Sequence, residues 1–214
     1  MLNIEHILLL LPGIIVGFTV HEFAHAFVAS RLGDATAKEM GRFTLNPLKH
    51  IDPIGFILLV TAGFGWAKPV LIDRSRLQNP RRDDVLISVA GPASNFLLSI
   101  IGTGVLAVLL YAVPLTGSPA YSWALHALTA GIYVNLGLGV FNLIPIPPLD
   151  GSHVLLQALN IKDEVNIRLF YKYGTILLLA VIVAERALRV DILPLGKVVS
   201  AIGEFLLTLF GIGG

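Results

Sequence analysis

Long apolar runs, broken by short polar segments, dominate the pattern of the chain. Four of them cover residues 7–31, 85–113, 121–145 and 169–188. Each is near or above the roughly 20 residues that a helix needs to cross a bilayer. We therefore predict four transmembrane helices. The first is expected to be retained, because it lacks a basic leader and a small-residue cleavage pattern.

Two shorter apolar stretches leave alternatives open. Residues 53–66 are short and interrupted by glycines, a pattern typical of a segment that dips into the membrane and returns. Residues 198–212 contain Glu204 and fit either a fifth span or an interfacial helix. With these stretches included, the pattern predicts about 4–6 transmembrane helices.

The segment between the first two long spans, residues 32–84, has a different pattern. GRFTL (41–45) and KPVLI (68–72) are predicted to form short strands, with a turn signal at GFGW (63–66) between them. The predicted fold is an all-α polytopic bundle with this small membrane-associated β element. We expect one membrane-embedded domain over residues 1–214.

Composition agrees with a membrane protein. Hydrophobic residues make up 55% of the chain and charged residues only 14%, against about 25% charged residues in a typical soluble domain. The net charge of +1 and the lack of a basic run give no support for nucleic-acid binding. The absence of cysteine excludes disulfides, thiolate zinc sites and a cysteine nucleophile.

The distribution of Lys and Arg predicts an orientation. Loop 114–120 carries none of them, and segment 149–172 carries three. The segment from residue 31 to residue 84 carries nine: Arg31, Lys38, Arg42, Lys49, Lys68, Arg74, Arg76, Arg81 and Arg82. The positive-inside rule places 32–84 and 149–172 in the cytoplasm and loop 114–120 outside.

One polar group interrupts the first apolar run, at HEFAH (21–25). Residues four apart lie on one face of a helix, so His21 and His25 can both direct a ring nitrogen at one ion. Glu22 lies about 100° around the helix, within reach of a metal-bound water as a general base. Polar packing between helices is the alternative, and it is disfavoured because ionisable groups in a span are costly and usually functional.

A hydrolytic zinc site needs a third protein ligand, and Asp150 is the best candidate. It ends the proline-rich stretch FNLIPIPPLDG (141–151) and is the only acidic residue between Asp84 and Lys162. Prolines prevent that stretch from continuing as a helix. Asp150 could instead cap the helix that follows, and its two oxygens could serve both roles.

The other histidines are not expected to bind the metal. His153 is expected to face the loop or to hydrogen-bond nearby, and His6, His50 and His126 have no partner at ligand spacing. Asn95, in GPASN (91–95), is expected to be structural or to contact substrate rather than to take part in the chemistry.

HEFAH together with LIPIPPLDG, both in apolar surroundings, resembles the site-2 protease family of intramembrane zinc metalloproteases. GRFTLNPLKHIDPIG, GWAKPV and GPASN are similar to segments of its short bacterial and archaeal members, without the PDZ or CBS domain that many members carry.

The resemblance implies one Zn²⁺ per chain, held by His21, His25 and Asp150, with Glu22 as general base. It also implies that Asn142, eight residues before Asp150, stabilises the oxyanion or positions the substrate. An interhelical hydrogen bond is the alternative role for Asn142.

The implied function is intramembrane zinc endopeptidase activity, with the active site near the cytoplasmic side of a prokaryotic cell membrane. Its expected partners are the lipid bilayer and transmembrane protein substrates, which the two predicted strands would hold by β-augmentation. A metal transporter and a non-catalytic zinc-binding scaffold are the alternatives. Rhomboid-type and aspartyl chemistry are disfavoured, because the chain has no G-x-S-G sequence and Asp150 has no second intramembrane aspartate.

Overall fold

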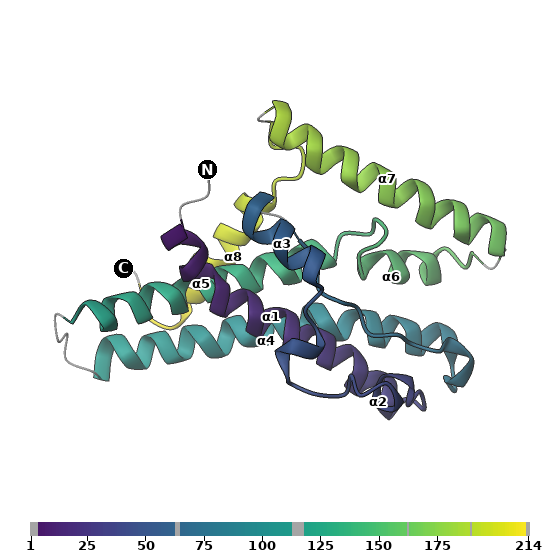
Figure 1. Cartoon of the computed structure of the whole chain (residues 1–214), viewed down its shortest axis with the longest axis horizontal. Coiled ribbons are helices and arrows are strands. Elements are labelled where there is room, and N and C mark those ends of the chain that lie inside the picture. Colours follow the sequence, from purple (N-terminus) through teal and green to yellow (C-terminus); the bar gives the residue numbers. More distant parts are fainter. Residues whose placement is uncertain (1–3, 63–64, 113–117, 162, 189, 213–214) are drawn as a thin grey trace.

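The computed structural model of the chain describes residues 4–62, 65–112, 118–161, 163–188 and 190–212, without the side chains at positions 60 and 62. Its elements over these residues are helical, and Figure 1 shows their arrangement. In chain order they are α1 (Ile4–Arg31), α2 (Thr36–Glu39), the 3₁₀ turn η1 (Pro47–Lys49), α3 (Pro53–Ala62), the 3₁₀ turn η2 (Arg74–Arg76), α4 (Pro80–Ala112), α5 (Pro119–Asn142), α6 (Gly151–Ala158), α7 (Glu164–Leu188) and α8 (Leu195–Leu209).

The prediction of four long spans is confirmed. Helices α1, α4, α5 and α7 are long and apolar enough to cross a membrane by length and composition. The two ambiguous stretches form the shorter helices α3, of 10 residues, and α8, of 15 residues. The described part of the chain is therefore a multi-pass bundle with two helices too short for a full perpendicular span.

Helices α1, α4 and α5 pack against one another and form the centre of the molecule (Figure 1). Glycines allow the closest approach: a Cβ atom added to Gly13 of α1 would lie 2.5 Å from the Cα atom of Gly131 of α5. Small residues commonly mediate such contacts between membrane helices, since lipid offers no hydrophobic drive for association. A buried apolar cluster then joins α4 and α5 to α8: Leu106, Ile132, Leu136 and Leu206.

Helix α7 lies apart from this three-helix centre in Figure 1. Its contacts with the rest of the chain include Gly174, where an added Cβ atom would lie 2.5 Å from Cδ of Pro147. Tyr171 adds a polar contact, with its hydroxyl 3.0 Å from Nε2 of His153. Only 6% of the most apolar 18-residue stretch of α7 is buried within the molecule, which suits a helix surrounded by lipid.

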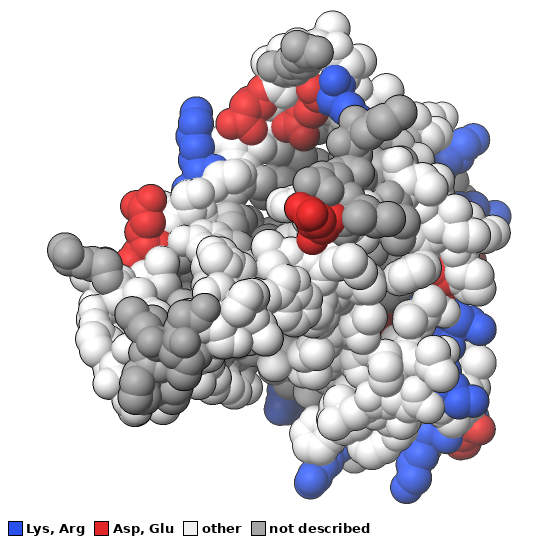
Figure 2. Space-filling model, turned by 60° about the vertical axis from the view of Figure 1, so that its left-hand side comes forward, with Lys and Arg blue, Asp and Glu red and all other residues white. Residues whose placement is uncertain are grey.

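The surface also suits a bilayer. Outside the residues drawn in grey, most of the face in Figure 2 carries no charged side chain, and Lys and Arg side chains lie mainly along its right-hand and lower margins. Large apolar side chains are exposed on the long helices, including Leu97 and Val108 of α4 and Val183 of α7. Such an apolar surface is unfavourable in water and favourable against lipid.

The predicted β element is wrong for the described residues. Segments 41–45 and 68–72 contain no strand, and the pairing in this region is an isolated antiparallel bridge between Ile51 and Ala67. Side chains occupy the backbone groups that a ladder would use. The Arg42 guanidinium donates to the carbonyl oxygens of Lys68 (2.7 Å) and Pro69 (3.3 Å).

Proline also limits pairing in this segment, because Pro69 has no N–H to donate. The next N–H, that of Val70, donates to a side chain of α1 instead of a strand. The predicted turn GFGW at 63–66 includes residues 63 and 64, which lie outside the described residues.

Candidate metal centre

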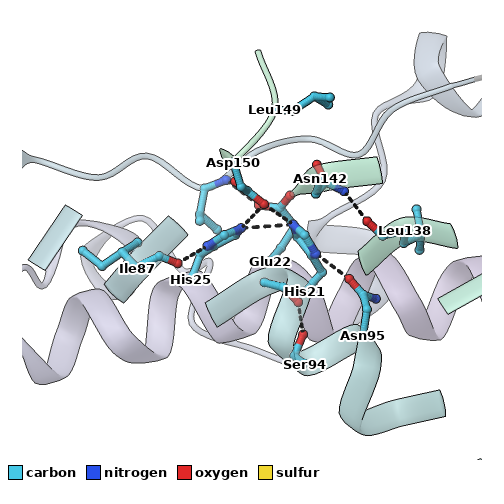
Figure 3. Close-up of polar contacts among 12 residues, drawn as sticks. His21, Glu22, His25, Ile87, Ser94, Asn95, Leu138, Asn142, Leu149 and Asp150 are labelled. Atoms are coloured by element: carbon cyan, nitrogen blue, oxygen red, sulfur yellow. Dashed lines mark hydrogen bonds and ion pairs between the residues drawn. The ribbon is translucent and has the colours of Figure 1, made fainter. Parts of the chain in front are cut away.

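Three potential metal ligands meet between α1 and the start of α6 (Figure 3). The Nε2 atoms of His21 and His25, one turn apart on α1, lie 3.0 Å from each other. The Oδ2 atom of Asp150 lies 3.1 Å from Nε2 of His21 and 3.4 Å from Nε2 of His25. Both imidazoles are buried, and the Asp150 side chain is 19% exposed.

The hydrogen bonds on the far side of each ring determine which nitrogen can bind a metal. Nδ1 of His25 lies 2.7 Å from the carbonyl oxygen of Ile87, which can only accept. Nδ1 of His21 lies 2.6 Å from Oδ1 of Asn95. Both Nδ1 atoms therefore donate, so both Nε2 atoms, which point toward Asp150, can offer a lone pair to a metal.

The donor set fits a zinc ion. Two ring nitrogens and a carboxylate oxygen converge, and the buried Oδ2 of Asp150 has no hydrogen-bond partner beyond these two rings in the described residues. Such an arrangement of acceptors is repulsive unless a positive charge is shared among them. In a tetrahedral zinc site with bonds of about 2.0–2.2 Å, neighbouring ligand atoms are about 3.3 Å apart. The observed separations of 3.0–3.4 Å are close to that value.

Asp150 also has the charge that a ligand needs. Burial by itself raises the pKa of its carboxyl, but protons on the adjacent His21 and His25 rings lower that pKa below its ordinary value, so the group is ionised. A bound cation would take the place of those ring protons and act on the carboxyl in the same direction. Asp150 stands at the N-cap position of α6, yet its side chain makes no capping hydrogen bond to this described helix. The structure therefore does not show the capping role that was the alternative.

Gly91 of α4 lies directly against the rings of His21 and His25. A Cβ atom at this position would lie 2.4 Å from Nε2 of His25 and 2.6 Å from Nε2 of His21. Any larger residue would have to displace these two Nε2 atoms. Glycine thus lets the α4 backbone approach the donor set, and the imidazoles pack directly against it.

Glu22 lies next to His21 on α1 and is buried, with 8% of its surface exposed. Its Oε2 atom accepts a hydrogen bond of 2.8 Å from the backbone N–H of Val70. This bond holds the carboxylate against the 68–72 segment. One oxygen is committed to Val70, and the other is the atom that can take up a proton.

Asn142 lies near the donor set in Figure 3 but is held by its own helix. Its Nδ2 atom donates to the carbonyl oxygen of Leu138, one turn earlier in α5, at 2.9 Å. In the described residues it has no hydrogen bond to the histidines or to Asp150. Its catalytic role stays a prediction.

The structure adds contacts of the candidate ligands His21 and His25 that sequence reasoning did not assign: Gly91, Asn95 and the Ile87 carbonyl. Asn95 is fully buried in α4. In the sequence, a polar amide within the apolar run 85–113 was the signal that could have identified it. His153 lies outside the donor set, as predicted, and hydrogen-bonds nearby with Arg74 and Tyr171.

Comparison with known proteins identifies a family and several relatives of the chain. The model of the family described as Peptidase family M50 matches residues 9–182. YwhC of Bacillus subtilis, whose name assigns it to the zinc metalloproteases, is 44% identical over 171 residues, which cover 79% of this chain and 78% of YwhC. No solved structure matches the chain.

Two mycobacterial proteins, both called Rip2 and also assigned by name to the zinc metalloproteases, are more distant. The protein of Mycolicibacterium smegmatis is 30% identical over 162 residues, which cover 73% of this chain and 60% of that protein. The protein of Mycobacterium tuberculosis H37Rv is 30% identical over 184 residues, which cover 82% of this chain and 67% of that protein.

Proposed function

Because this chain belongs to Peptidase family M50, the site-2 protease family, and is a zinc-dependent membrane metalloprotease, we propose that it cleaves membrane proteins within or near their transmembrane segments. The proposed enzyme is a single membrane-embedded domain over residues 1–214. The family membership decides against the metal-transporter and silent-scaffold alternatives.

The proposed zinc ligands are His21, His25 and Asp150. The observation that carries this assignment is the convergence of three potential ligand atoms within 3.0–3.4 Å. Bound zinc would supply Lewis acidity toward a carbonyl oxygen and lower the pKa of water from 15.7 to about 7.

Glu22 is the proposed general base and acid. Its carboxylate is adjacent to the donor set and is oriented by the Val70 N–H at 2.8 Å. It would accept the proton of the attacking water and deliver it to the amine of the leaving peptide. Asn142 is proposed to donate to the developing oxyanion or to position the substrate, which would require its amide to turn away from the Leu138 carbonyl.

The position of the site along α1 supports cleavage inside the membrane. His25 precedes Arg31, the last residue of α1, by six residues, a rise of about 9 Å. The site is therefore within the candidate span and near its basic end. Since basic loops are cytoplasmic by the positive-inside rule, we place this end, and the peptide bond to be cut, near the cytoplasmic face. The bacterial relatives support a prokaryotic cell membrane.

The proposed substrate class can be tested in liposomes containing the zinc-loaded protein. The comparison uses one single-span substrate and a second in which the same cleavable sequence is held outside the bilayer by a soluble domain. We expect cleavage of the first, near the cytoplasmic end of its span, and at least tenfold slower cleavage of the second. Equal or faster cleavage of the soluble form would contradict an intramembrane specificity.

A further inference from the structure

A chain of buried amide hydrogen bonds leads from α5 through α4 to the metal centre. It begins at Asn135 of α5, which is only 4% exposed. The Nδ2 atom of Asn135 donates to the carbonyl oxygens of Gly131 (2.8 Å) and Gly13 (3.4 Å). Backbone carbonyls can only accept, so the amide nitrogen must face them and Oδ1 must face Asn95.

The orientation of the Asn135 amide determines that of the Asn95 amide, which is fully buried in α4. Nδ2 of Asn95 donates to Oδ1 of Asn135 at 2.9 Å and to the carbonyl oxygen of Gly17 at 3.2 Å. Both partners are acceptors, so Oδ1 of Asn95 must face Nδ1 of His21, 2.6 Å away. That nitrogen then carries the proton, and Nε2 keeps its lone pair for the metal.

We propose that Asn135 is a positioning residue of the metal centre, which acts through Asn95 to hold His21 in its metal-binding tautomer. The proposal rests on the proposed function, in which His21 is a zinc ligand. Over the described residues, Asn135 makes no hydrogen bond to the donor set or to Glu22. Asn135 takes no part in the reaction itself; it determines the direction of the hydrogen bonds from Asn95 and from Nδ1 of His21.

Helix packing and ligand chemistry are coupled in this arrangement. The Gly13 carbonyl comes within reach of Asn135 because Gly13 and Gly131 let α1 and α5 approach closely. Reversing either amide would place oxygen against oxygen in a dry environment, where an unmatched polar group is costly. The close contact between α1 and α5 at Gly13 and Gly131 therefore also helps to fix the orientation of the His21 ring.

The test is a double-mutant cycle in zinc affinity, measured by chelator competition on Asn135→Leu, Asn95→Leu and the double variant. Loss of a partner behind a ligand typically costs 10- to 100-fold in metal affinity. We expect about tenfold weaker zinc binding for Asn135→Leu and a larger loss for Asn95→Leu. The double variant should bind zinc as Asn95→Leu does, because Asn135 acts only through Asn95.

Two further variants separate this role from a general effect on packing. Thr103→Val removes another fully buried hydrogen bond of α4, from the Thr103 hydroxyl to the Ser99 carbonyl (2.8 Å), and should leave zinc affinity unchanged. In Asn135→Asp, a neutral carboxyl can donate to the Gly131 carbonyl and accept from Asn95, so zinc affinity should recover to within about threefold of wild type. Losses that multiply in the double variant, or unchanged affinity in Asn135→Leu, would overturn the proposal.

The wild-type protein gives a second measurement that does not depend on the folding of any variant. In zinc-free protein, ¹⁵N shifts of the neutral His21 ring should report the Nδ1–H tautomer, and the Nε2–H tautomer would overturn the proposal. Failure of the proposed function would look different: zinc affinity would then survive His21→Ala. If His21→Ala loses zinc and Asn135→Leu does not, only the positioning role is refuted.

Discussion

At the scale of single residues, the candidate centre depends on groups that fix the direction of its donors. The spacing within HEFAH predicted the histidine pair, because i and i+4 share a helix face. Their hydrogen-bond partners could not be predicted, since Asn95 is 74 residues from His21 and Ile87 is 62 residues from His25. Contacts at such separations depend on how helices pack, and no local pattern encodes them.

Gly91 provides a direct test at this scale. Gly91→Ala would place a Cβ atom 2.4 Å from Nε2 of His25, so we expect zinc affinity to fall at least tenfold, measured by chelator competition. Gly137→Ala is the matched control, because a Cβ atom there meets nothing within 4 Å. Wild-type zinc affinity in Gly91→Ala would contradict the described packing of the rings.

At the scale of elements, the long apolar runs predicted the four candidate spans because their length and composition suffice. The predicted strands were wrong because β-propensity describes side chains, whereas pairing requires free backbone groups. In 68–72 those groups are occupied by Arg42 and Glu22, and Pro69 lacks an N–H. The extended segment instead supports the proposed general base.

Val70 tests that support. Val70→Pro removes the N–H that donates to Glu22 at 2.8 Å. A hydrogen bond to a charged group contributes about 1.5–3 kcal/mol, so we expect kcat to fall about tenfold or more while zinc content is unchanged. Val70→Ala keeps the N–H and should retain at least half of the wild-type kcat. Equal kcat values for the two variants would show that the contact is dispensable.

At the scale of the whole molecule, the proposed metal joins parts of the chain that are distant in sequence. His21 and His25 belong to α1, and Asp150 precedes α6 after the central bundle has been completed. A cation bound by all three would link these parts in the folded state only. Metal binding should therefore contribute to the stability of the fold.

Zinc removal should consequently lower the unfolding temperature. Zinc at 100 times its Kd stabilises the fold by about 2.7 kcal/mol, which corresponds to roughly 5–10 °C for a chain of this size. Differential scanning of the detergent-solubilised protein with and without a chelator would measure the shift. Asp150→Ala should abolish it, and a chelator shift of wild-type size in that variant would remove Asp150 from the proposed ligand set.

The central claim is that Glu22 performs proton transfer beside a zinc ion held by its neighbours. The most direct measurement compares wild type and Glu22→Gln for both zinc content and cleavage of a single-span substrate. The amide preserves the size of the side chain and an acceptor for Val70 but cannot act as the base. We predict full zinc occupancy with cleavage reduced at least 100-fold, whereas wild-type cleavage by Glu22→Gln would contradict the account.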